Sequence, residues 1–266
     1  MSNQYIGVFD SGLGGLTAVK EIMRLMPKQS IIYFGDTGRV PYGTRGRDTI
    51  IKYVKGDIRF LKSFGVGAIV AACGTASSVA LPEIKDEEIP VIGVLDATAE
   101  KAVKVTKNKK IGIIGTPGTI KSVAYEKLIH NIDSDIFTFS RACPLFVPLV
   151  ENGYFNNDAT RFVIEDYLTD IKNSGVDTLI LGCTHYPLLK TAISEFMGEG
   201  VTLVEPGAEV AAYIKKQGLY CEFEGNEIDK YQFYVSDNTE SFEELGGVFL
   251  QQKIIGQVKK IDIEKY

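Results

Sequence analysis

Short apolar runs alternate with amphipathic stretches along the whole chain. Residues 16–26 and 50–61 repeat apolar side chains at helical spacing, and Pro27 and Gly65 stand where these two helices are expected to end. Between such stretches lie runs that are apolar throughout, which is typical of parallel strands covered by helices on both faces. These predicted strands cover residues 5–10, 31–36, 67–73, 91–95, 110–116, 135–140, 177–183, 201–206 and 231–236. The pattern therefore predicts an α/β fold with doubly wound parallel sheets.

Two of the predicted strands end in similar sequences. "AIVAACGTAS" and "TLILGCTHYP" each place a cysteine after the apolar run, at Cys73 and Cys183, and a threonine within two residues. Cysteine is often buried as a small apolar residue, so coincidence is one interpretation. The other is that two pseudo-symmetric domains face each other across a cleft that holds the active site. We place these domains at residues 1–95 plus 208–266 and at residues 96–207.

Composition narrows the classes of function. The 266 residues are 45% hydrophobic and 24% charged, as in ordinary globular proteins, and the formal net charge of -5 leaves no basic footprint for nucleic acid or a membrane surface. No apolar run approaches the roughly 20 residues that span a bilayer. The four cysteines are widely spaced, which favours reduced thiols over a disulfide scaffold. We expect a cytoplasmic protein that acts on a small molecule.

Polar residues follow directly after several predicted strands, where parallel sheets form their sites. The loop "DSGLGG" (residues 10–15) is a candidate anion-binding loop, but it lacks the full pattern of a dinucleotide-binding or phosphate-binding loop. In "GDTGRVPYG" the backbone N–H groups of Tyr42 and Gly43 are candidates for binding a ligand carboxylate. Both segments are also compatible with plain turns.

The two cysteines allow three kinds of chemistry. A zinc site would use Cys73, Cys183 and His185, but the spacing is not that of usual zinc ligands. A single cysteine nucleophile would use His185 as its base. A pair of thiols would remove a proton from one face of a carbon and return a proton to the opposite face, inverting its configuration. For this third case we expect the preceding strand and following helix to let each thiol titrate near neutral pH.

Seven segments together resemble the cofactor-independent glutamate racemases, in order and over nearly the full chain. They are "DSGLGGLTA", "GDTGRVPYG", "CGTAS", "GTPGTIKSVAY", "ACPLFVPLVENG", "LGCTHYPLL" and "FYVSDN". The resemblance implies two pseudo-symmetric α/β domains, a homodimer, no cofactor and no metal. It also implies interconversion of L-glutamate and D-glutamate, which supplies peptidoglycan synthesis.

The resemblance also implies roles for individual residues. Cys183 is expected to deprotonate L-glutamate and Cys73 to deprotonate D-glutamate, with Asp10 and His185 assisting the thiols and Glu151 as a further catalytic contributor. Cys143 and Cys221 match no catalytic position, so we expect both to be buried. The implied substrate contacts are Asp10, Ser11, Tyr42, Gly43, Gly74, Thr75, Thr116, Thr119, Thr184 and His185.

The sequence departs from the family pattern at Gly74, where the family usually has asparagine. The missing amide would remove a polar contact worth on the order of 1 kcal/mol, so we expect activity with an altered substrate preference. One alternative is therefore an aspartate racemase or a related enzyme that uses the same cysteines on another acid. A second alternative is a protein that binds an acidic metabolite without turnover.

Overall fold

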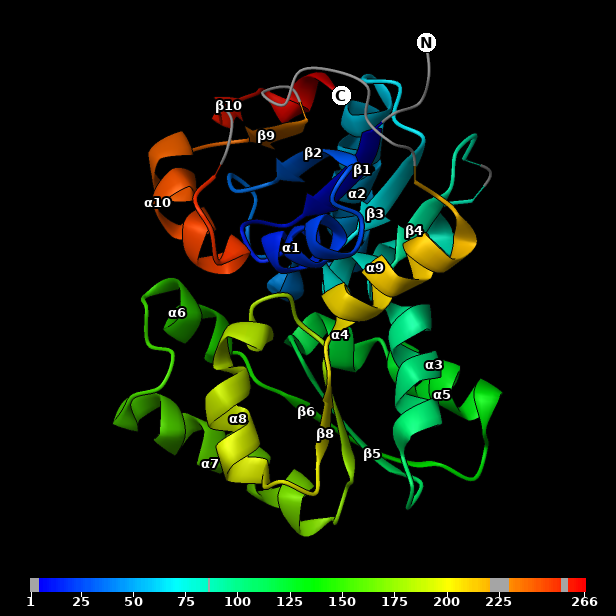
Figure 1. Cartoon of the computed structure of the whole chain (residues 1–266), viewed down its shortest axis with the longest axis vertical. Coiled ribbons are helices and arrows are strands. Elements are labelled where there is room, and N and C mark those ends of the chain that lie inside the picture. Colours follow the sequence, from blue (N-terminus) through cyan, green and yellow to red (C-terminus); the bar gives the residue numbers. More distant parts are fainter. Residues whose placement is uncertain (1–4, 86, 221–229, 255–257) are drawn as a thin grey trace.

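The computed structural model describes residues 5–85, 87–220, 230–254 and 258–266. It contains two α/β domains, stacked along the long axis of the molecule, and each is built on a parallel sheet (Figure 1). The predicted fold class is thus confirmed. The first sheet contains β1 (Tyr5–Asp10), β2 (Ser30–Gly35), β3 (Ala68–Ala71), β4 (Val91–Gly93), β9 (Tyr231–Val235) and β10 (Val258–Lys260). The second contains β5 (Lys110–Gly115), β6 (Phe137–Ala142), β7 (Thr178–Leu181) and β8 (Thr202–Val204).

Four strands of each sheet follow the same order. In the first sheet the order is β10-β9-β2-β1-β3-β4, and in the second it is β6-β5-β7-β8. The order β2-β1-β3-β4 therefore repeats as β6-β5-β7-β8, which makes β3 and β7 equivalent strands. Cys73 follows β3 and Cys183 follows β7, each two residues after its strand ends. The two cysteines consequently occupy equivalent positions in the two domains.

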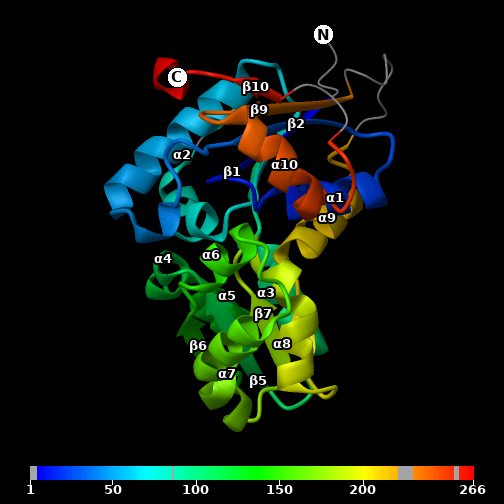
Figure 2. The ribbon, with the colours of Figure 1, turned by 90° about the vertical axis from the view of Figure 1, so that its left-hand side faces the viewer.

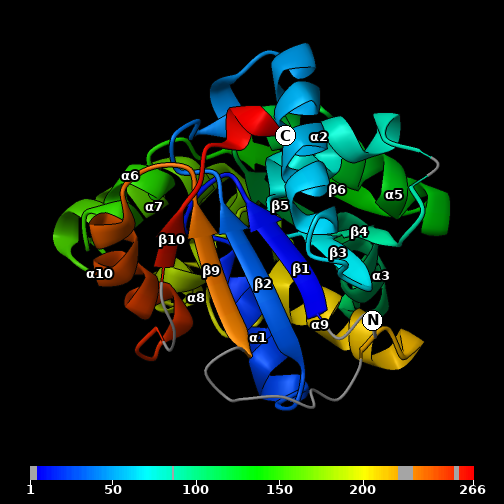
Figure 3. The same cartoon turned by 90° about the horizontal axis from the view of Figure 1, so that it is seen from above.

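Helices cover both faces of the first sheet (Figure 3). One face packs on α1 (Leu16–Leu25) and α10 (Thr239–Leu250), and the other packs on α2 (Arg47–Lys62). Successive strand residues point to opposite faces. In β1, Val8 accordingly joins the cluster that contains α1, whereas Phe9 joins the cluster that contains α2.

The first two helices end where the sequence predicts. The last residue of α1 is Leu25, just before Pro27. After α2, Gly65 has a left-handed φ of 67° and its N–H donates to the Lys62 carbonyl at 3.0 Å. Glycine adopts this backbone conformation without the steric cost of a side chain.

The second sheet lies between two helical layers (Figure 1). One layer contains α3 (Leu95–Val105) and α5 (Ala124–Ile132), and the other contains α7 (Asp158–Asn173) and α8 (Lys190–Met197). Two short helices, α4 (Pro117–Lys121) and α6 (Phe146–Glu151), lie at the end of this domain that faces the first domain (Figure 2). The carboxyl ends of the second set of strands therefore point toward the first domain.

The two domains share one apolar core through α9 (Pro206–Gln217), which packs against both α1 and α3. The cluster that contains Val19 and Ala211 also contains Ile113 of the second sheet. After α9 the chain returns to the first sheet, where β9 pairs with β2. Crossings near residues 96 and 207 remain our proposal for the domain boundaries. No helix in the described part of the chain is long and apolar enough to span a membrane.

Candidate active site

A small enclosed cavity lies where the carboxyl ends of the strands of both domains meet. Its volume is about 30 Å³, roughly the space of one water molecule. The first domain contributes Ser11, Val40, Pro41, Tyr42, Gly43, Cys73, Gly74 and Thr75, and the second contributes Thr116, Val147, Gly182, Cys183, Thr184 and His185. Three further residues implied by the resemblance do not line the cavity but contact residues that do. Asp10 contacts Thr184, Thr119 contacts Thr116, and Glu151 contacts His185.

Cys73 lies in the first domain with only 5% of its surface exposed. The Cys73 thiol donates a hydrogen bond to Ser11 Oγ at 3.7 Å. Its Sγ also accepts a hydrogen bond from the Ala76 N–H at 3.4 Å. The N–H belongs to a short helical segment, η2 (Ala76–Ala80), which has π-helical geometry. Burial, together with the Asp10 carboxylate, raises the pKa of Cys73 to about 12. The expected titration near neutral pH is therefore wrong for Cys73 in this closed cavity, where the thiol is protonated.

Cys183 lies in the second domain beside a buried imidazole. Its Sγ is 4.0 Å from Nδ1 of His185, and Nε2 of the same ring is 2.9 Å from Oε1 of Glu151. Burial lowers the pKa of His185, but the contacts with Cys183 and Glu151 outweigh it and raise the pKa to about 10. The ring is thus a cation at neutral pH, placed to stabilise negative charge on Cys183.

Replacing Glu151 by glutamine should make the stability of the protein less dependent on pH. The pKa of His185 is about 10 in the folded protein and 6.5 in an ordinary setting, so the bound proton stabilises the fold fully below about pH 6.5. This contribution is lost as the pH rises toward 10, by at most about 1.4 kcal/mol per pH unit. Without the Glu151 carboxylate the folded-state pKa of His185 should be less raised, so the protein should lose less stability over this pH range.

Urea denaturation across this pH range measures the effect as the difference between wild type and E151Q. The matched control is E165Q, because Glu165 is exposed on α7 and its side chain has no ion-pair partner among the described residues. Parallel pH profiles for wild type and E151Q would contradict a contribution of Glu151, beside that of Cys183, to the raised pKa of His185.

Asp10 is fully buried at the end of β1 and joins the two domains. Its carboxylate accepts from the Gly12 N–H at 2.9 Å and from Thr184 Oγ1 at 3.3 Å. Burial raises the pKa of Asp10 above its ordinary value, although the charge of His185 opposes this rise. Asp10 is therefore placed to influence both thiols, through its charge on Cys73 and through Thr184 beside Cys183.

Three threonine hydroxyls meet across the boundary between the domains. Thr75 Oγ1 lies 2.9 Å from Thr116 Oγ1 and 3.5 Å from Thr119 Oγ1, and the last two lie 3.0 Å apart. Because Thr75 belongs to the first domain and the other two to the second, the two hydrogen bonds of Thr75 form only when the domains are close together. The cluster offers hydroxyl donors to a ligand carboxylate, as the resemblance implies.

The segment that contains Tyr42 and Gly43 is held by a buried ionic network. The Tyr42 hydroxyl contacts a carboxylate oxygen of Asp36 and lies 2.9 Å from Asp57 Oδ2. Arg39 donates to Asp36 at 2.6 Å and to Asp57 at 2.9 Å. Burial and the neighbouring Asp36 carboxylate raise the pKa of Asp57 well above its ordinary value. Among the described residues no backbone carbonyl accepts from the N–H of Tyr42 or Gly43, so both remain available to a ligand.

Two glycines of the first domain allow the second domain to pack closely against them. A Cβ atom on Gly14 would lie 2.1 Å from Thr184 Oγ1 and 2.6 Å from His185 Nδ1. A Cβ atom on Gly74 would lie 2.4 Å from the carbonyl oxygen of Gly182. The departure from asparagine at Gly74 therefore has a steric aspect, because this closed arrangement has no room for any side chain there.

Several residues around the cavity were not singled out from the sequence. Val40, Pro41, Val147 and Gly182 also line it. Of these, Gly182 could have been found, since it directly precedes Cys183 at a strand end. Phe249 of α10 packs its ring against His185 at 5.2 Å between centroids, and no local sequence signal marks that contact.

The remaining cysteines lie away from this cavity or outside the described residues. Cys143 is fully buried and its thiol donates to the Arg141 carbonyl at 3.7 Å, which confirms the expected burial. Cys221 lies outside the described residues. Within the described ranges no three His, Cys, Asp or Glu side chains are arranged to hold one metal ion.

Comparison with known proteins defines the class to which this fold and cavity belong. Residues 15–214 match the model of the Asp/Glu/Hydantoin racemase family, and the chain belongs to that family. It is therefore an isomerase, as the motifs predicted.

Individual relatives resemble the chain over its whole length. A glutamate racemase from Geobacter metallireducens is 42% identical over 262 residues, covering 97% of both chains. The crystal structure of a glutamate racemase isoform from Bacillus anthracis has a TM-score of 0.91 at 37% identity, covering 98% of this chain and 99% of that one. That of the Francisella tularensis glutamate racemase in complex with D-glutamate has a TM-score of 0.90 at 35% identity, covering 100% of both chains.

Proposed function

We propose that this chain is a glutamate racemase that moves protons to and from Cα with two cysteines. The observation that carries the proposal is the equivalent placement of Cys73 and Cys183, which follow β3 and β7 and line one cavity. Full-length similarity to glutamate racemases supports glutamate as the substrate. As the resemblance implies, we further propose a cytoplasmic homodimer that supplies D-glutamate for peptidoglycan.

In the direction from L- to D-glutamate, the Cys183 thiolate takes the α-proton and leaves a carbanion. The protonated thiol of Cys73 then donates its proton to the opposite face of the same carbon, which inverts the configuration. The high pKa of Cys73 suits it as this acid. The positively charged ring of His185 lies beside this sulfur, with Nδ1 4.0 Å from Cys183 Sγ.

In the reverse direction the thiols exchange roles. Cys73 must then act as the base, and the ammonium group of a bound amino acid would lower its pKa by charge attraction. This direction starts from the state that the forward reaction leaves behind, with Cys73 as thiolate and Cys183 as thiol, and the Cys183 thiol donates its proton to the carbanion. The carbanion carries its charge largely on the α-carboxylate, where fixed donors stabilise it. The hydroxyls of Thr75 and Thr184 and the backbone N–H groups of Tyr42 and Gly43 are the proposed donors.

Substrate entry requires the domains to separate. A cavity of about 30 Å³ is much too small for glutamate, and its walls come from both domains. The hydrogen bonds from Thr75 to Thr116 and Thr119 cross the domain boundary, so they must break or rearrange when the substrate enters. The structure thus corresponds to a closed arrangement in this proposal.

Incubation with L-glutamate in deuterated water tests the proposal. Proton NMR should show loss of the α-proton signal, and circular dichroism should show loss of optical activity at the same time. Aspartate assayed in parallel should react far more slowly, and the double variant C73A/C183A should be inactive. Faster turnover of aspartate would favour the aspartate racemase alternative. Binding of glutamate without exchange would favour the non-catalytic alternative.

A further inference from the structure

A second cavity opens between the domains, next to the candidate active site. Its volume is about 610 Å³, within the range of small-molecule sites. None of the described residues that line it also lines the smaller cavity. The first domain contributes residues around the start of α2 and residues 78–83, and the second contributes residues of α4 and α5. The elements α2 and α4 face each other in Figure 2.

The lining of this cleft is basic. It contains Arg45, Arg47, Lys121 and Lys127 against a single acidic residue, Glu83. Glu83 is paired with Arg47 at 2.5 Å. Within the part of the chain that the structure describes, the other three cations have no ion-pair partner. A concave surface with excess positive charge attracts anions, even though the whole chain has a net charge of -5.

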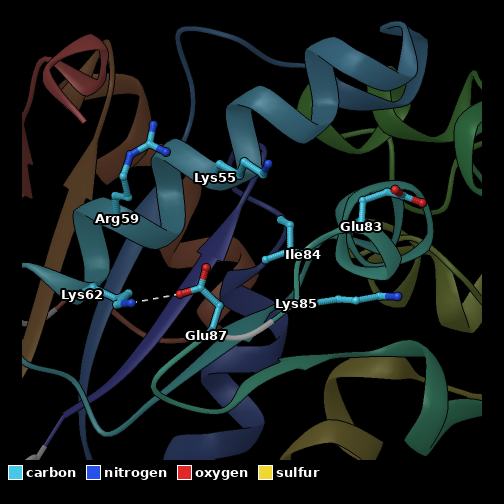
Figure 4. A pocket seen from close by; sticks show the side chains of 7 residues that line it. All are labelled: Lys55, Arg59, Lys62, Glu83, Ile84, Lys85 and Glu87. Atoms are coloured by element: carbon cyan, nitrogen blue, oxygen red, sulfur yellow. Dashed lines mark hydrogen bonds and ion pairs between the residues drawn. The ribbon is translucent and has the colours of Figure 1, made fainter.

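Another basic groove, on the first domain alone, contains two carboxylates, Glu83 and Glu87 (Figure 4). It has a volume of about 400 Å³ and includes Arg59 and Lys62 of α2. Lys62 is paired with Glu87 at 2.9 Å, and Arg59 donates to the carbonyl of Tyr266. Groups of the protein itself therefore satisfy these two cations. Lys55 and Lys85 of this groove have no ion-pair partner among the described residues, as is true of three cations of the interdomain cleft. The interdomain cleft differs because its cations stand on two domains and only one carboxylate lines it.

We propose that this interdomain cleft binds a small oxyanion with at least two negative charges, held by Arg45, Lys121 and Lys127. Guanidinium groups bind phosphate-like oxyanions through paired hydrogen bonds, and lysines add flexible point charges. An anion with several charged oxygens can contact cations on both walls at once. This ligand chemistry is that of inorganic phosphate, pyrophosphate or a phosphate monoester.

The bound anion connects the two domains. Arg45 belongs to the first domain, and Lys121 and Lys127 belong to the second. The wall between the two cavities is a close backbone contact, since a Cβ atom on Gly118 would lie 3.1 Å from the carbonyl oxygen of Gly43. An anion in the cleft therefore stabilises the arrangement in which the domains are close together. This inference concerns binding and does not depend on the racemase proposal.

Isothermal titration of the full chain with pyrophosphate at low ionic strength tests this site. We expect saturable binding of one anion per chain. The double variant K121Q/K127Q should weaken it about tenfold or more, and R45Q should also weaken it measurably. The matched control is K216Q, an exposed lysine at the end of α9, which should leave the affinity unchanged. Thermal unfolding of each variant confirms that the fold is intact.

Three results would overturn the proposal: no saturable binding to wild type, equal affinity in K121Q/K127Q, or equal weakening by K216Q. If R45Q retained full affinity while the lysine variant lost it, the site would lie on one domain and the bridging role would be wrong. Parallel titrations with inorganic phosphate and glycerol 3-phosphate distinguish a free inorganic ion from a phosphorylated metabolite as the better ligand.

Discussion

Replacing Cys73 by serine should slow the inversion of glutamate about 10²- to 10⁴-fold, and the same change at Cys183 should have an effect of similar size. Serine preserves the size of the side chain, but its hydroxyl is a far weaker acid than a thiol and supplies almost no anion at neutral pH. Each variant therefore lacks one of the two groups that we propose exchange protons with Cα. Circular dichroism of the glutamate solution measures the rate of inversion.

Deuterium exchange separates the roles of the two thiols. In C73S the remaining Cys183 can still remove the α-proton of L-glutamate and return deuterium to the same face. Exchange without inversion should therefore survive better than inversion, and C183S should show the same pattern with D-glutamate. Inversion at the wild-type rate in either variant would contradict the two-cysteine mechanism. The matched control is C143S, because Cys143 is buried and does not line the cavity.

Replacing Gly14 by alanine should lower the rate of racemisation by about 10²-fold while leaving the protein folded. The added Cβ atom would overlap Thr184 Oγ1 and His185 Nδ1, which lie 2.1 Å and 2.6 Å from its ideal position. These side chains must then move by an ångström or more, and a displacement of that size at a reacting group typically costs two orders of magnitude. Steady-state assays should show most of the loss in kcat.

Gly200→Ala is the matched control for this substitution. A Cβ atom on Gly200 would have no atom within 4 Å, so this variant should retain wild-type activity. Equal activity of G14A and wild type would show that the turn formed by Cys183, Thr184 and His185 can be displaced without lowering the rate of racemisation. The positions of Thr184 and His185 seen here would then have no role in the reaction.

The strand pattern predicted much of the fold and brought the main site residues together. Uninterrupted apolar runs identify buried parallel strands, and the polar residues after them meet because parallel strands end at one edge. This reasoning was sufficient to place Cys73, Cys183 and His185 on one cavity. It missed β10, because only Val258 of that strand is buried and the run is short.

Other features depend on distances that a sequence does not encode locally. One network joins Asp57 to Arg39 and Tyr42. Asp57 lies in α2, and the other two residues lie in the segment that precedes this helix. The hydrophobic periodicity of the sequence gives no sign of these contacts. The pKa of Cys73 was predicted in the wrong direction, because the helical N–H was foreseen while the depth of burial and the nearby Asp10 were not. The steric limits at Gly14 and Gly74 likewise arise from the packing of one domain on the other.

In the proposed mechanism the repeated strand order places one proton-transferring cysteine in each domain, yet the surroundings of the two cysteines are chemically unlike. Cys73 has a serine and a carboxylate as neighbours, whereas Cys183 has a charged imidazole. Enantiomers have equal free energies in water, so the equilibrium constant of a racemase is unity. Unequal turnover numbers in the two directions must then be matched by proportional differences in KM. The unlike surroundings of the two sulfurs can thus tune how tightly each mirror image is held, but never the final ratio of the two.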